Sequence, residues 1–173
     1  MQEIRLAKTA GFCFGVNRAV SMVYAMLEEG KTVYTLGPII HNPQVVTDLE
    51  KRGVVIVDET GEVPQGAVLV VRTHGVPAAV TQAIKERGLD CCDATCPFVS
   101  KIHQIVAKRS EGGDIVLIAG DPAHPEVQGI RGHCPGKSYV FNGVGQLEDL
   151  LRTYPEFSNA PISVVAQTTF HIK

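Results

Sequence analysis

The sequence predicts an α/β protein in which parallel sheets are covered by helices. Short segments rich in Val and Ile alternate with longer amphipathic segments along the 173 residues. Such alternation is typical of parallel strands joined by crossover helices. Two parts of the chain also repeat one another at a constant spacing, which indicates two copies of one α/β unit. The composition suits a folded core, because 45% of the residues are hydrophobic and only 20% are charged.

The expected strands are short apolar segments, most of them dominated by β-branched residues, which favour extended structure. They are residues 2–8, 32–36, 54–57, 67–72, 114–119, 138–141 and 162–166.

Helical periodicity fills the segments between these strands. One helix is expected directly after Cys13 and another directly after Cys96, each with apolar residues three or four positions apart. The apolar face comprises Val16, Val20, Val23 and Leu27 in the first helix, and Phe98, Ile102 and Ile105 in the second. Helical stretches are expected to stop at Gly30, Gly53 and Gly88.

The internal repeat brings reactive residues into register. The pairs separated by 83 residues are Cys13 with Cys96, Gly37 with Gly120, and His41 with His124. A further pair, His74 with Thr168, follows at a spacing of 94, so the two copies differ in length. These residues fall at expected strand-to-helix turns, where open α/β sheets build their sites. Repetition of reactive residues, and not only of packing residues, predicts one shared site.

The two repeating cysteines favour an iron–sulfur cluster over zinc. Zinc sites commonly use CxxC pairs, and neither Cys13 nor Cys96 has a partner at that spacing. Separated thiolates suit an iron–sulfur cluster. The other three cysteines, Cys91, Cys92 and Cys134, have no repeat partner and are expected to be small packing or surface residues.

Charge and composition argue against several partners. The chain has 16 Lys and Arg against 18 Asp and Glu, with a formal charge of −2 and no basic stripe. Neither a nucleic-acid nor a membrane partner is therefore expected. The N-terminal residues show no signal-like leader, and the five cysteines are an odd number in a chain without secretory features. A cytoplasmic location and thiol or metal chemistry are expected.

Six motifs in order, GFCFGVNRA, LGPIIHNPQVV, VRTHGVP, DATCPFVSKIH, AHPEVQGI and AQTTF, closely resemble the LytB/IspH family of 4-hydroxy-3-methylbut-2-enyl diphosphate reductases. The resemblance implies a pseudo-threefold trefoil of small α/β domains around a central 4Fe-4S cluster, two of which are present here. Residues 1–13 would form a leading strand and the first cluster turn, residues 14–96 the first domain and residues 97–173 the second. The third domain, with the third cysteine ligand, would lie beyond residue 173, so the chain is expected to be an incomplete form.

The resemblance also implies a role for each matching residue. Cys13 and Cys96 would bind the cluster, and His41 and His74 the diphosphate. The catalytic pair would be His124, which also contacts the substrate, and Glu126, which delivers a proton. The remaining substrate contact would be Thr168.

The implied reaction is the reductive removal of an allylic hydroxyl from (E)-4-hydroxy-3-methylbut-2-enyl diphosphate, the last step of the methylerythritol phosphate route to isoprenoids. The products would be isopentenyl and dimethylallyl diphosphate, and the electrons would come from a donor such as flavodoxin or ferredoxin. The 173 residues alone are expected to be inactive. Two alternatives from other classes remain, namely a hydrolase with a cysteine nucleophile and a metal-free module that binds diphosphates.

Overall fold

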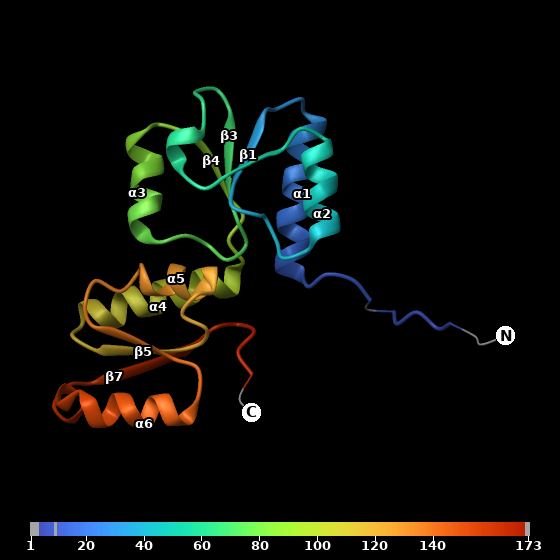
Figure 1. The fold of residues 1–173 in the computed structure, drawn as a ribbon. Coiled ribbons are helices and arrows are strands. Elements are labelled where there is room, and N and C mark those ends of the chain that lie inside the picture. Colours follow the sequence, from blue (N-terminus) through green and yellow to red (C-terminus); the bar gives the residue numbers. More distant parts are fainter. Residues whose placement is uncertain (1–3, 9, 172–173) are drawn as a thin grey trace.

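The computed structural model describes residues 4–8 and 10–171, which form two α/β lobes, each around its own sheet (Figure 1). The first lobe contains α1 (Phe14–Glu28), β1 (Val33–Leu36), α2 (Pro43–Lys51), β2 (Val55–Val57), η1 (Thr60–Glu62), β3 (Val68–Val71), α3 (Ala78–Glu86) and β4 (Asp90–Asp93). The second contains α4 (Pro97–Glu111), β5 (Ile115–Ala119), α5 (Pro125–Arg131), β6 (Ser138–Phe141), α6 (Val144–Thr153), η2 (Pro155–Ser158) and β7 (Ile162–Ala166).

The two sheets share one topology, which confirms the α/β fold and the internal repeat. The strand order is β2-β1-β3-β4 in the first sheet and β6-β5-β7 in the second, and every pairing is parallel. Strands β2, β1 and β3 thus correspond to β6, β5 and β7. The change in spacing from 83 to 94 residues arises between β6 and β7, where α6 and η2 stand in place of the short η1.

Each sheet buries apolar side chains on both faces. In the first lobe, α1 and α2 cover one face and α3 the other (Figure 1), and Val23 and Ile84 belong to the two separate clusters that result. In the second lobe, α4 and α5 pack on one face and α6 on the other. Strands buried on both faces explain the continuous apolar runs of β3 and β5. Among the helices that the structure describes, none has the length and apolarity needed to span a bilayer.

The expected strand at residues 2–8 is not observed in its described part. Residues 2 and 3 lie outside the described residues, and residues 4–8 form no strand. Ile4 and Leu6 are 94% and 85% exposed. A strand needs hydrogen bonds from a neighbouring strand and a surface on which to bury its apolar face, and neither lobe provides these to residues 4–8.

The other six expected strands are confirmed, but strand β4 was not predicted and the predicted face of α4 is wrong. Strand β4 has the sequence DCCD, which carries no apolar pattern, because it lies at the sheet edge with little of its surface buried. In α4 the buried face runs through Val99, His103 and Val106, one position away from the predicted face, and Phe98 is 70% exposed. That side chain lies in the cavity described below and not in the core.

Gly75 lies where the two lobes meet, and a substitution there tests how closely they pack. Its φ is +70°, and a Cβ built there would lie 2.5 Å from Cε1 of His103. We expect Gly75→Ala to lower the free energy of unfolding by about 2–4 kcal/mol, since the left-handed backbone and the clash both cost energy. Gly30, with φ +74° and nothing within 4 Å of its built Cβ, is the matched control. Gly30→Ala should cost about 1 kcal/mol in urea unfolding, and equal losses would contradict the close contact with His103.

Candidate functional site

A cavity of about 620 Å³ opens between the two lobes at the carboxyl ends of their strands. This is where parallel sheets of this kind place their ligands. All the site residues expected from the sequence line it, namely Cys13, His41, His74, Cys96, His124, Glu126 and Thr168. The structure therefore brings together residues that are up to 155 positions apart in the sequence.

Hydrogen bonds between the strand-end loops hold these residues in place. The amide of Cys96 donates to the carbonyl of Thr73, next to His74, at 2.9 Å. The hydroxyl of Thr73 donates in turn to the carbonyl of Ile39, two residues before His41, at 3.0 Å. The three loops that follow β1, β3 and β4 are thus linked to one another. Because these bonds run between backbone groups and a buried threonine, the site rests on rigid elements.

Cys13 and Cys96 occupy equivalent positions, as the N-caps of α1 and α4. Within the described residues, neither thiol makes a capping hydrogen bond, so both sulfurs are available to a ligand. Helix N-termini favour negative charge, which suits a thiolate. A Cβ built at Gly15 would lie 2.6 Å from the sulfur of Cys96. The glycine therefore permits the first turn of α1 to approach the second cysteine.

Arg18 helps to fix the loop that carries Cys96. Its guanidinium donates to the carbonyls of Asp93 and Thr95 at 3.3 and 3.2 Å. The equivalent basic residue of the second copy, Lys101, is exposed. This arginine thus ties α1, which begins at Cys13, to the segment just before Cys96.

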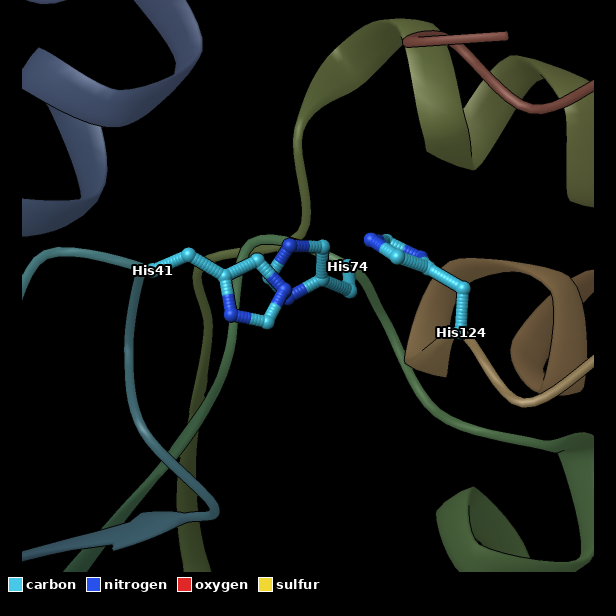
Figure 2. Close-up of side chains that lie close together, drawn as sticks. All are labelled: His41, His74 and His124. Carbon is cyan, nitrogen blue, oxygen red and sulfur yellow. The ribbon is translucent and has the colours of Figure 1, made fainter. Parts of the chain in front are cut away.

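Three histidines converge from three loops (Figure 2). The ring centroids of His41 and His74 are 4.4 Å apart, and that of His124 lies 5.4 and 5.3 Å from them. Burial is the main cause that lowers the pKa of His74, to about 4, and the nearby His41, His124 and Arg72 act in the same direction. Burial, with His124 and Arg72, also lowers the pKa of His41. His41 and His74 are therefore neutral at pH 7 and can each donate one hydrogen bond.

Glu126 is a buried carboxylate beside the histidines. It is 2% exposed and accepts two hydrogen bonds from Thr168, one from the amide at 2.6 Å and one from the hydroxyl at 2.8 Å. The amide of Glu126 itself donates to Nδ1 of His124 at 3.1 Å. Glu126, His124 and Thr168 thus form one hydrogen-bonded group across α5 and the end of β7.

Sequence reasoning missed two residues, Gly15 at this site and Arg72 beside it. Gly15 contacts Cys96 as described, and Arg72 follows β3 with its side chain against Gly37, where a built Cβ would lie 2.3 Å from the guanidinium. A charged residue directly after the buried run VLVV was the available signal for Arg72. Gly15 belongs to the motif GFCFGVNRA, but nothing local predicts its contact, because that contact comes from the other lobe.

The three remaining cysteines lie outside this cavity. Burial raises the pKa of Cys134 to about 11, and burial is also the first cause that raises the pKa of Cys92. A thiol must lose its proton to bind a metal, so both are poor ligands. Cys91 is exposed, and Cys92 and Cys134 are half-buried, as expected for small packing or surface residues.

The fold and the cavity define a class of protein: two repeated α/β lobes that gather cap cysteines, histidines and a buried carboxylate into one site. The chain belongs to the LytB protein family, whose family model matches residues 4–173. Similar proteins include two called 4-hydroxy-3-methylbut-2-enyl diphosphate reductase. The one from Geobacter sp. (strain M21) is 44% identical over 167 residues, and the one from Geobacter metallireducens is 48% identical over 168.

Solved structures give the same result. A structure of the E-1-hydroxy-2-methyl-but-2-enyl-4-diphosphate reductase from Plasmodium falciparum matches 94% of this chain, with a TM-score of 0.83 and 32% identity. Another, of (E)-4-hydroxy-3-methyl-but-2-enyl diphosphate reductase, matches 99% of it with a TM-score of 0.79 and 38% identity. The chain spans 57% of the length of both Geobacter relatives, and 50% and 60% of the two structures.

Proposed function

We propose that this chain forms two of the three domains of a reductase that removes the allylic hydroxyl of (E)-4-hydroxy-3-methylbut-2-enyl diphosphate. The domains would be residues 14–96 and 97–173, with residues 1–13 leading into the first. The observation that carries the proposal is the convergence of two cap cysteines, three histidines and a buried glutamate in one cavity. The similarity to proteins called 4-hydroxy-3-methylbut-2-enyl diphosphate reductase supports it.

Cys13 and Cys96 would hold a 4Fe-4S cluster. Their donor set fits it, because thiolates are the soft ligands that such clusters use, and both sulfurs are free of capping hydrogen bonds among the described residues. When bound, such a cluster would supply electrons and a Lewis-acidic iron. A third thiolate is expected from outside the 173 residues.

The histidines would bind the diphosphate. His41 and His74 each offer one N–H, and two neutral rings avoid the repulsion that two close cations would create. Nδ1 of His124 accepts a hydrogen bond from the amide of Glu126. The ring proton therefore lies on Nε2, which can donate a hydrogen bond to another group. The positive charge of Arg72 lowers the pKa of both His41 and His74 and would attract an anion. Together these groups suit an anion despite the net charge of −2.

Glu126 would supply the proton to the leaving hydroxyl. The overall change consumes two electrons and two protons, breaks the C–O bond, forms a C–H bond and releases water. The hydroxyl of Thr168 lies 2.8 Å from the carboxylate of Glu126 and lines the cavity. A proton on the carboxyl group can therefore reach a substrate oxygen through this hydroxyl. Flavodoxin or ferredoxin as electron donor, and a cytoplasmic location, belong to the same proposal.

The proposal is tested by iron and acid-labile sulfide analysis after anaerobic reconstitution. The protein for this test is a chimera, defined as this chain joined to the segment of the Geobacter sp. relative that follows the matched region. We expect a brown protein that contains iron and sulfide. A hydrolase with a cysteine nucleophile and a metal-free diphosphate module both predict a colourless protein without sulfide.

Gly15 offers a test of the cluster position without any change to a ligand. An alanine Cβ there would lie 2.6 Å from the sulfur of Cys96, well inside normal contact distance, so the thiol must move. We expect the iron content of the Gly15→Ala chimera to fall below half of the unmodified value. Gly143→Ala is the control, because nothing lies within 4 Å of its built Cβ. Full iron content in Gly15→Ala would place the cluster away from Cys96.

A further inference from the structure

The three histidines are close enough to share one metal ion. One ring nitrogen from each of His41, His74 and His124 lies within 4.8 Å of the other two. A tetrahedral zinc ion holds imidazole nitrogens at about 2.0–2.1 Å, which places them about 3.4 Å apart. His41 is exposed and free to close the remaining gap. Three histidine nitrogens with an open fourth position form a ligand set that zinc accepts.

We propose that His41, His74 and His124 form a binding site for a divalent transition-metal cation, with zinc as the probe, separate from the two cysteines of the same cavity. The site uses the nitrogen atoms that the proposed function assigns to the diphosphate, so cation and diphosphate exclude one another. The cation site itself does not depend on the reductase activity. It requires only the arrangement of the three rings (Figure 2).

The state of the rings supports binding. A metal ion needs a nitrogen lone pair, which a neutral imidazole ring supplies. Nδ1 of His74 is buried and has no hydrogen-bond partner within the described part of the chain. The ring is therefore not committed to one tautomer by a protein partner, and either nitrogen can carry the proton.

Charged groups of both signs lie around the rings. Arg72 opposes a cation, and its influence reaches His41 and His74. The carboxylate of Glu126 lines the same cavity, as do the thiols of Cys13 and Cys96, and a negative group close to the site favours a cation.

His124 is the weakest of the three ligands. Its Nδ1 accepts the amide of Glu126, which fixes the proton on Nε2. A cation at Nε2 would require that proton to move to Nδ1, and a cation at Nδ1 would replace the amide. Either way this hydrogen bond is lost on binding. We therefore expect the loss of His124 to weaken binding less than the loss of His41 or His74.

Isothermal titration calorimetry tests the proposal by measuring the affinity and stoichiometry of zinc binding to the purified chain under reducing conditions. We expect one nitrogen-ligated site per chain, weakened at least tenfold by His41→Gln and by His74→Gln, and by a smaller factor by His124→Gln. His171→Gln is the matched control, since His171 is exposed outside the cluster, and it should bind like the unmodified chain. Circular dichroism checks that each variant is folded. Because His41 is exposed, His41→Gln is the substitution that should disturb the fold least.

X-ray absorption at the zinc edge separates this site from binding to the thiols. Nitrogen ligands at about 2.0–2.1 Å are expected, whereas thiolates would appear at about 2.3 Å. Cys13→Ser/Cys96→Ser should keep the nitrogen-ligated site. Zinc held only by sulfur, an unchanged affinity in His41→Gln, or the absence of any site would each overturn the proposal. None of these results depends on whether the chain carries a cluster or reduces a diphosphate.

Discussion

Cys96→Ser in the chimera is expected to abolish cluster assembly, with iron and acid-labile sulfide falling to about a tenth or less of the unmodified protein. Thiolate ligation is what retains the iron, and a serine hydroxyl is a harder and far less acidic donor. Cys13→Ser should have the same effect, because the two residues are equivalent N-caps on the repeated helices α1 and α4. Anaerobic reconstitution followed by iron and sulfide analysis measures both variants.

Cys134→Ser serves as the control for this experiment. Cys134 lies outside the cavity, and burial raises the pKa of its thiol to about 11, so its loss should leave the iron content unchanged. Normal iron and sulfide in Cys96→Ser would contradict the assignment. A loss in Cys134→Ser alone would move the ligand set to a different part of the chain.

Glu126→Gln is expected to reduce turnover by about 10²–10⁴-fold, the usual contribution of a positioned acid, while cluster content stays near normal. Glutamine keeps the shape of the buried side chain, and its carbonyl oxygen can still accept the amide of Thr168, which now donates to the carboxylate at 2.6 Å. It has no acidic proton to give. The measurement is the rate of allylic alcohol reduction with an artificial reductant, at a known iron content.

Glu148→Gln is a suitable control, because Glu148 is an exposed residue of α6 in the second lobe. It should leave the rate unchanged. If Glu126→Gln turns over at the unmodified rate, another group delivers the proton, and His124 or the substrate diphosphate becomes the candidate.

The candidate site was largely predictable from the sequence because the repeat carries reactive residues and not only core positions. Cys13 and Cys96 keep the spacing of 83 residues and recur as helix N-caps, so a comparison of the two copies finds them directly. The strands were predictable for a related reason. Strands buried on both faces, such as β3 and β5, are continuous apolar runs that composition alone identifies.

The features that were missed depend on contacts between distant parts of the chain. Gly15 matters only because the sulfur of Cys96 approaches it, and that approach is created by folding. Strand β4 pairs with β3 at the sheet edge through backbone hydrogen bonds, which leave no pattern in its side chains. Phe98 fits the helical period but faces the cavity, so periodicity placed it wrongly in the core. In each case the deciding interaction is tertiary.

Product analysis tests most directly whether this cavity, completed by a third domain, reduces an allylic diphosphate as proposed. The chimera, reconstituted anaerobically and supplied with an artificial reductant, is given (E)-4-hydroxy-3-methylbut-2-enyl diphosphate, with the Geobacter sp. relative and the 173-residue chain assayed in parallel. We expect the chimera to form isopentenyl and dimethylallyl diphosphate, and the 173-residue chain alone to form neither product. A chimera that holds iron and sulfide but forms no product, while the relative does, would contradict the proposed function. Equal product from the chain alone would contradict the need for a third domain.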